Sequence, residues 1–187
     1  MWLIAGLGNP DRKYLKTRHN AGFMAADELA LLLGAQWGPG PRNTESLMAR
    51  AEADGQEVLL LKPLTYMNRS GMAVREVLRK NNIRPEKNLI VIHDDIDMET
   101  ARIRIRKNGS AGGHRGVESV ILETGTKEFI RVKIGVGRDP SLPADVYVLQ
   151  KFSKTEAPLM EEAVHRAAQA VIDVITLGVE TAMNRFN

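Results

Sequence analysis

Short apolar runs alternate with amphipathic helical patterns along the whole chain, and this alternation constrains the fold more than any other feature. Residues 2–5 form an apolar run that ends in a glycine-rich turn, and apolar side chains recur at near-helical spacing over residues 20–33. A second run, residues 88–93, is almost continuously apolar, as is typical of a strand covered on both faces. Helical patterns also occur over residues 70–80 and 158–177. Strands and helices in this order predict an α/β fold.

One pair of strands is expected to be antiparallel. Residues 46–53 alternate between two faces, and residues 58–62 form another apolar run. Between them lies Asp54-Gly55, a pair that favours a tight hairpin turn. The glycine- and proline-rich residues 37–43 are expected to be a loop. The chain contains no internal repeat or linker, so we predict a single domain over residues 1–187, with a mixed, twisted sheet covered by helices.

Two helices carry sequence signals for their first turn. Ser70 is expected to cap the helix that runs to residue 80, although Asn68 could serve the same purpose. Ser153 and Glu156 form the Ser-x-x-Glu pattern of a capping box, so the last long helix is expected to begin there and to end at Gly178.

Positive charge is concentrated in one part of the chain. The net charge is only +3, but residues 102–138 hold nine lysines and arginines against three glutamates. Residues 102–106 and 129–136 alternate in the manner of strands, so their basic side chains are expected to point away from the core. These side chains are Arg102, Arg104, Arg106, Arg131 and Lys133. Such a face attracts polyanions, although charge alone favours an ordinary solvated surface.

The composition excludes several classes of site. There is no cysteine, so disulfides, thiolate nucleophiles and zinc–thiolate sites are excluded, and a reducing cytoplasm suits the chain. No stretch approaches the roughly 20 apolar residues of a membrane span, and the first residues lack the basic leader of an export signal. We therefore expect a cytoplasmic protein with no membrane contact. No obligate protein partner is indicated, and we expect a monomer.

Three polar segments are candidates for the lining of a cleft. They are residues 8–10, 65–68 and 93–97, and ligands in such sheets bind beyond the carboxyl ends of the strands. The first segment is not a dinucleotide fingerprint, because Asp11 stands where the third glycine would be.

Ionisable side chains in and near these segments could carry chemistry. The carboxylates of Asp94, Asp95 and Asp97 beside His93 could hold Mg²⁺ or Mn²⁺, or form a strand-end turn with one functional carboxylate. His19 could act as a base near neutral pH, although a lone histidine is more often structural.

Six short motifs, in this order, occur along the chain: GLGNP, TRHNAG, KPLTYMNRSG, HDDID, GSAGGHRG and AMNRFN. Through them the chain resembles the bacterial-type peptidyl-tRNA hydrolases over essentially its whole length. The resemblance implies hydrolysis of the ester that joins a peptide to the terminal ribose of tRNA, with peptidyl-tRNA as the partner, in translation and ribosome rescue. It implies no cofactor and no metal.

The resemblance also implies roles for individual residues. His19 would be the general base that activates water, Asp94 would hold it in the productive tautomer, and the Asn9 amide would stabilise the reacting carbonyl. Residues implied in substrate binding are Tyr14, Tyr66, Met67, Asn68, His114 and Arg115, and those implied in binding tRNA phosphates are Arg104, Arg106 and Lys133. From composition alone, Met67 would be a core residue and the two tyrosines surface packing residues.

Three positions depart from the family pattern. Arg115 follows the histidine of GGHRG where the family most often has asparagine, Lys133 stands where arginine is frequent, and Asp11 replaces the usual glycine. We expect Arg115 to alter tRNA contact before it affects chemistry, because a guanidinium suits phosphate. The alternatives are an RNA-binding relative of the same fold that has lost hydrolysis and acts in RNA processing, and a general esterase. The chain contains no GxSxG nucleophile elbow, so the sequence gives no support to a general esterase.

Overall fold

A mixed seven-stranded sheet forms the centre of the computed structural model, which describes residues 1–187. The strand order is β2-β3-β4-β1-β5-β7-β6, in which β4, β1, β5 and β7 are parallel and the flanking strands are antiparallel to their neighbours. The strands are β1 (Trp2–Gly6), β2 (Gly38–Pro39), β3 (Ser46–Ala53), β4 (Gln56–Pro63), β5 (Leu89–Asp95), β6 (Ile103–Arg106) and β7 (Ile130–Gly135). The predicted α/β fold with a mixed sheet is confirmed.

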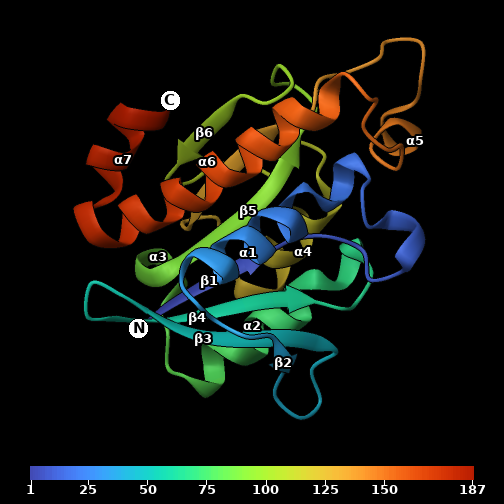
Figure 1. Ribbon diagram of the computed structural model, residues 1–187. Coiled ribbons are helices and arrows are strands. Elements are labelled where there is room, and N and C mark those ends of the chain that lie inside the picture. Colours follow the sequence, from blue (N-terminus) through green and yellow to red (C-terminus); the bar gives the residue numbers. More distant parts are fainter.

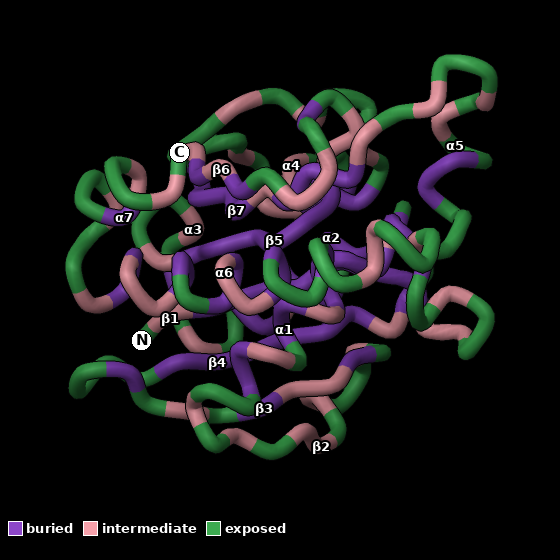
Figure 2. Tube along the Cα trace, turned by 45° about the horizontal axis from the view of Figure 1, so that its top comes forward, coloured by how far each residue is buried: buried purple, intermediate pink, exposed green.

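Helices cover both faces of this sheet. Figure 1 shows α1 and α6 in front of it and α2 and α4 behind it. The helices are α1 (Ala21–Leu32), α2 (Ser70–Lys80), α3 (Pro85–Asn88), α4 (Arg115–Thr124), α5 (Ala144–Tyr147), α6 (Glu156–Leu177) and α7 (Val179–Phe186), with short 3-10 turns η1 (Arg12–Tyr14), η2 (Arg18–Asn20) and η3 (Met67–Arg69). Each face buries its own apolar cluster, so the central strands are buried on both sides (Figure 2). None of the helices combines the length and apolar character needed to cross a membrane.

Two glycines allow α1 to pack directly on the backbone of the sheet. A Cβ on Gly22 would overlap the carbonyl oxygen of Ile92 in β5, and one on Gly6 would overlap the carbonyl oxygen of Gly22. Helix and strands can approach this closely only where no side chain intervenes. The approach holds the start of α1, and with it the preceding turn η2, at the carboxyl end of β1.

The predicted hairpin is confirmed, and the predicted loop before it is partly wrong. Asp54 and Gly55 have φ of 49° and 72°, the left-handed values that a two-residue hairpin turn requires, and β3 and β4 pair antiparallel across them. Within residues 37–43, Gly38 and Pro39 form the short edge strand β2 against β3. Proline is tolerated at such an edge because it need not donate a ladder hydrogen bond.

Helix capping follows the sequence at one helix and departs from it at another. The amide of Ser153 donates to Glu156 Oε2 at 2.8 Å and the amide of Glu156 donates to Ser153 Oγ at 3.2 Å, as the capping box predicts. Ser70 is not a cap: it is the first residue of α2, and its hydroxyl donates to the Met67 carbonyl. Asn68 does not cap α2 either, since it lies in η3 and no side-chain cap is present.

One of the predicted outward basic side chains is buried. Arg131 is 1% exposed, and its guanidinium lies over the Phe129 ring, with Nη2 donating to the carbonyl of Gly109. The face of β7 that carries it is covered by the segment before α4, which the period of two along the strand could not reveal.

Candidate active site

A cleft of about 690 Å³ opens at the carboxyl ends of β1, β4 and β5. It is lined by the three polar segments that the sequence placed there, together with the loop before α4 and residues around α5. Strands that run parallel end at the same edge, which is why segments far apart in the chain meet.

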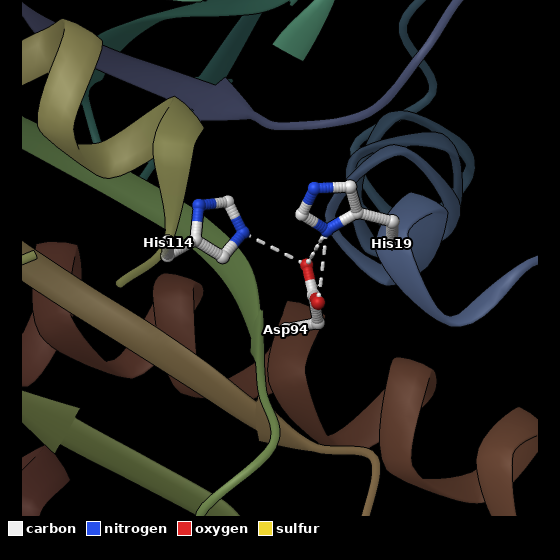
Figure 3. A group of neighbouring side chains, drawn as sticks. All are labelled: His19, Asp94 and His114. Atoms are coloured by element: carbon white, nitrogen blue, oxygen red, sulfur yellow. Dashed lines mark hydrogen bonds and ion pairs between the residues drawn. The ribbon is translucent and has the colours of Figure 1, made fainter. Parts of the chain in front are cut away.

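His19 and Asp94 form a hydrogen-bonded dyad in this cleft. His19 Nδ1 lies 3.0 Å from each carboxylate oxygen of Asp94, and the side chains are 12% and 1% exposed. The other ring nitrogen, Nε2, points away from the carboxylate (Figure 3). Burial alone would raise the pKa of Asp94, but the neighbouring His19 and His114 outweigh it and hold that pKa well below its usual range. The carboxylate is therefore ionised, and it requires a proton on His19 Nδ1.

His114 is bonded to the same carboxylate from the opposite side (Figure 3). Its Nδ1 accepts the backbone N–H groups of Gly116 and Val117, both at 3.2 Å, and so caps α4. Because Nδ1 is an acceptor, the ring proton of neutral His114 sits on Nε2, which donates to Asp94 Oδ1 at 2.9 Å. The sequence indicated only a substrate-binding residue here. The sequence could not indicate the bond between His114 and Asp94, because only folding brings these two side chains together.

These hydrogen bonds bear on metal binding. Ligand atoms of His19, Asp94 and His114 lie within 4.8 Å of one another, a spacing that could hold a cation. A metal on His114 Nε2 would need that nitrogen's lone pair, and the ring would then carry no proton while Nδ1 still faced two donors. The hydrogen bonding therefore favours protons over a metal at this cluster.

The other carboxylates of the predicted acidic cluster are engaged in ion pairs. Asp95 accepts from Lys133 Nζ at 2.9 Å, and Asp97 pairs with Arg138 at 3.3 Å. All three carboxylates line the cleft, but only Asp94 bonds the histidines, so this geometry favours the alternative of a strand-end turn over a three-carboxylate magnesium site.

A third histidine, His93, packs beneath the dyad. It is 3% exposed, its Nδ1–H donates to the Asp94 carbonyl oxygen at 2.7 Å, and its ring meets His114 edge-on at 4.8 Å. Burial, reinforced by His114, lowers the pKa of His93 to about 3. His93 is therefore neutral at physiological pH and supports the backbone that carries Asp94.

Met67 orients the side-chain amide of Asn9, and Asn20 holds the Asn9 backbone. Asn9 Oδ1 accepts the Met67 backbone N–H at 3.0 Å. This bond fixes the orientation of the amide and leaves Nδ2 available as a hydrogen-bond donor in the cleft. The Asn20 side chain holds the backbone of Asn9: its Oδ1 accepts the Asn9 backbone N–H and its Nδ2 donates to the Asn9 backbone carbonyl, both at 2.9 Å. Asn20 is 1% exposed and was missed as a site residue, although it lies in the motif TRHNAG directly after His19.

Most of the implied binding residues line the same cleft. They are Tyr14, Tyr66, Met67, Asn68, His114, Arg115, Arg104 and Lys133. Arg106 does not line it: in the β6–β7 register Arg104 lies beside Lys133, whereas Arg106 lies beside the buried Arg131.

The model of the family described as Peptidyl-tRNA hydrolase matches residues 3–187. The chain belongs to the peptidyl-tRNA hydrolase family. It is 47% identical to a peptidyl-tRNA hydrolase of Thermoanaerobacter sp. (strain X514), with 100% of both chains covered, and 43% identical to one of Thermodesulfovibrio yellowstonii, with 100% of this chain and 99% of the relative covered. The crystal structure of peptidyl-tRNA hydrolase from Acinetobacter baumannii superposes with a TM-score of 0.93 at 34% identity, covering 100% of this chain and 94% of that one.

Two of the departures from the peptidyl-tRNA hydrolase pattern lie in the cleft. Arg115 is exposed at the first turn of α4 and has no hydrogen-bond or ion-pair partner in the protein. Lys133 is neutralised by Asp95 at 2.9 Å. Asp11, the third, accepts from the Tyr66 hydroxyl at 3.2 Å and so joins the first and second polar segments.

Proposed function

We propose that this protein hydrolyses the ester bond between a peptide and tRNA, releasing the free peptide and a reusable tRNA, with His19 as general base. The observation that carries the assignment is the His19–Asp94 dyad, with Nδ1 bound to an ionised carboxylate at 3.0 Å and Nε2 free, in the cleft of a member of the peptidyl-tRNA hydrolase family.

Water is the nucleophile in this mechanism. His19 Nε2 takes a proton from water as its oxygen attacks the ester carbonyl, and the Asp94 carboxylate stabilises the imidazolium that forms. When the tetrahedral intermediate collapses, the bond to the ribose oxygen breaks and the imidazolium returns the proton to that oxygen. No covalent enzyme intermediate is needed.

Two amides serve the carbonyl that reacts. Asn9 Nδ2 is free to donate because Oδ1 is held by the Met67 amide, so it can stabilise the developing oxyanion. Asn68, exposed in the cleft, can bind the peptide backbone next to the ester. Met67, 5% exposed, provides an apolar wall below them.

The rim of the cleft suits the acceptor end of tRNA. Tyr14 and Tyr66 offer aromatic faces for terminal bases, and Arg115 and Arg104, which line the same cleft, offer charge for phosphates. Lys133 is a weaker candidate for phosphate binding because Asp95 already neutralises its charge. Arg106 would bind phosphate outside the cleft. Phosphate contacts of this kind carry little sequence information, which suits an enzyme that accepts many tRNAs.

The alternatives are less favoured. A non-hydrolytic RNA-binding relative would have no need of a base whose tautomer is held by a buried carboxylate. A general esterase would not need the basic side chains of β6 and β7 to bind its substrate.

The decisive experiment compares an N-blocked aminoacyl-tRNA with its unblocked counterpart, with chelator present. We expect wild-type protein to release the blocked acyl group and His19→Ala to lower that rate by about 10² to 10⁴-fold, with tRNA binding retained. His165→Ala, at a histidine of α6 outside the cleft, is the matched control and should behave as wild type. Tight tRNA binding without release by wild type would contradict the proposal.

The phosphate contacts are tested by the salt dependence of tRNA binding. Arg104→Ala should weaken binding and reduce the slope of log K against log salt concentration by about 0.7 to 0.9, because one cation–phosphate contact is lost. Arg50→Ala, at an exposed arginine paired with Glu57 on β3, is the control. An unchanged slope in Arg104→Ala would remove that residue from the tRNA site.

A further inference from the structure

The residue before His19 is a buried arginine whose charge the mechanism does not use. Arg18 is 6% exposed, and its guanidinium lies 4.4 Å from the ring centroid of Tyr147 and 5.2 Å from that of Phe152. Its Nη2 bonds both carboxylate oxygens of Glu156 at 2.8 Å, and its Nη1 donates to the Lys151 carbonyl at 2.7 Å. All of these partners lie more than 125 residues further along the chain.

Backbone hydrogen bonds join the same two parts of the chain. The Arg18 amide donates to the Gln150 carbonyl at 3.0 Å, and the His19 amide donates to the Val148 carbonyl at 2.8 Å. Thr17 and Lys151 form an antiparallel bridge beside them. The turn that carries His19 is therefore attached to residues 148–151 by its backbone as well as by the Arg18 side chain.

The attached segment is one wall of the cleft. Ala144, Asp145, Val148 and Leu149, here called the α5 wall, all line it. The far end of this segment is anchored to a rigid element, because Glu156 also accepts the Ser153 amide in the capping box of the 22-residue helix α6. One guanidinium thus connects the start of α6, the α5 wall and the residue next to His19.

We propose that Arg18 is a positioning residue that holds His19 and the α5 wall of the cleft as one unit, with Glu156 as its anchor. Displacement of the wall then displaces the backbone of His19 as well, so substrate binding and base alignment depend on the same contact. The kinetic part of this inference rests on the proposed hydrolysis.

The geometry calls for arginine at this position. A planar guanidinium can bond both oxygens of Glu156 with one nitrogen and a carbonyl with another while stacking on aromatic rings. A lysine ammonium keeps the charge that compensates Glu156 but cannot make these contacts together. Arg18→Lys therefore separates the geometry of the contact from its charge.

The test combines kinetics with hydrogen exchange on the intact protein. In Arg18→Lys we expect KM to rise several-fold and kcat to fall about tenfold to a hundredfold, the cost of a base displaced by up to about 1 Å. The pH profile should keep its shape because Asp94, the hydrogen-bond partner of His19 Nδ1, is not changed by the substitution. The amide of His19 should exchange faster while amides of β5 do not. Glu156→Gln, which can still accept the Ser153 amide, should shift KM and kcat in the same direction by less.

A destabilised control separates positioning from folding. Val171→Ala removes buried volume from the middle of α6 away from the cleft, and any loss of folded protein should lower apparent kcat with KM unchanged. If Arg18→Lys and Glu156→Gln behave in that way, Arg18 is only structural and the inference is overturned. Should Arg18→Lys fail to fold, Glu156→Gln decides on its own. Should wild type show no hydrolysis, the proposed function fails, while local exchange at the His19 amide still decides whether Arg18 holds that turn.

Discussion

Backbone hydrogen bonds fix the position of the proton on His114, and the Asp94 carboxylate fixes the position of the proton on His19. The N–H groups of Gly116 and Val117 can only donate, so His114 Nδ1 must accept and Nε2 must carry the proton. That proton meets Asp94 Oδ1, and the ionised carboxylate then accepts the proton on His19 Nδ1. At the scale of single residues, therefore, the Asp94 carboxylate determines which nitrogen of His19 remains a base, and the first turn of α4 directs His114 Nε2–H to the same carboxylate.

Asp94→Asn tests this chain of donors and acceptors. The amide oxygen of asparagine would face the proton of His114, leaving its NH₂ group towards His19 Nδ1. His19 would then have to accept through Nδ1 and carry its proton on Nε2, so the base would be lost. We expect kcat to fall by about 10³ to 10⁴-fold, with tRNA binding retained. Asp173→Asn, at a carboxylate of α6 paired with Arg185, should leave kcat unchanged. A drop of less than tenfold in Asp94→Asn would show that the tautomer is held in another way.

At the scale of elements, helix α4 and the site share one residue. His114 caps the first turn of α4 with Nδ1 and bonds Asp94 with Nε2, so a structural contact and a site contact come from the two nitrogens of one ring. Gly116 in the same turn leaves room for the sulfur of Met67, which a Cβ would overlap. The loop GSAGGHRG thus joins helix capping to the wall of the cleft.

Two substitutions of His114 separate these contacts. Asparagine is a good N-cap whose oxygen can replace Nδ1, but its side chain is too short to reach Asp94 as well. We expect both variants, His114→Asn and His114→Ala, to lose the bond to Asp94 and so to have a lower kcat and a lower stability, measured by urea unfolding. His114→Asn should retain the cap. His114→Ala should lose about 1 kcal/mol of unfolding free energy in addition. Equal stability of both variants would show that the cap contributes little to α4.

At the scale of the whole molecule, buried ionisable groups make stability depend on pH. The folded pKa of His93 is about 3, against an ordinary value of 6.5. Below about pH 6.5, His93 therefore binds a proton in the unfolded chain but not in the folded protein. The free energy of unfolding falls as the pH drops towards about 3. The lowered pKa values of Asp94 and Glu156 act in the same direction, but only below the ordinary range of carboxylates near pH 4.

The histidine contribution can be isolated between pH 6 and 4.5. Wild-type unfolding free energy should fall with a slope steeper by about 1 kcal/mol per pH unit than that of His93→Asn, measured by urea unfolding at several pH values. Asparagine can retain the bond to the Asp94 carbonyl because its Nδ2 replaces Nδ1. Parallel curves for the two proteins would show that His93 is not the group that titrates on unfolding.

Local patterns in the sequence were sufficient for most of the fold. The left-handed pair Asp54-Gly55, the capping box at Ser153 and the apolar run of β5 each depend on residues within a few positions, so their conformations can be predicted from spacing and residue type. Three polar segments at the strand ends also predicted the position of the cleft, because parallel strands end at one edge. The resemblance to peptidyl-tRNA hydrolases, carried by motifs in order, supplied the family.

The tertiary structure alone decided how the site residues are held. His19 and Asp94 are 75 residues apart, and Arg18 and Glu156 are 138 apart, so no local period relates them. The same holds for the burial of Arg131, which depends on the segment that covers β7, and for the bond of Asn20 to Asn9. Residue type and spacing determine where a chain turns and which face of an element is apolar. The partner of a buried polar atom is determined only when packed elements bring a donor and an acceptor together in space.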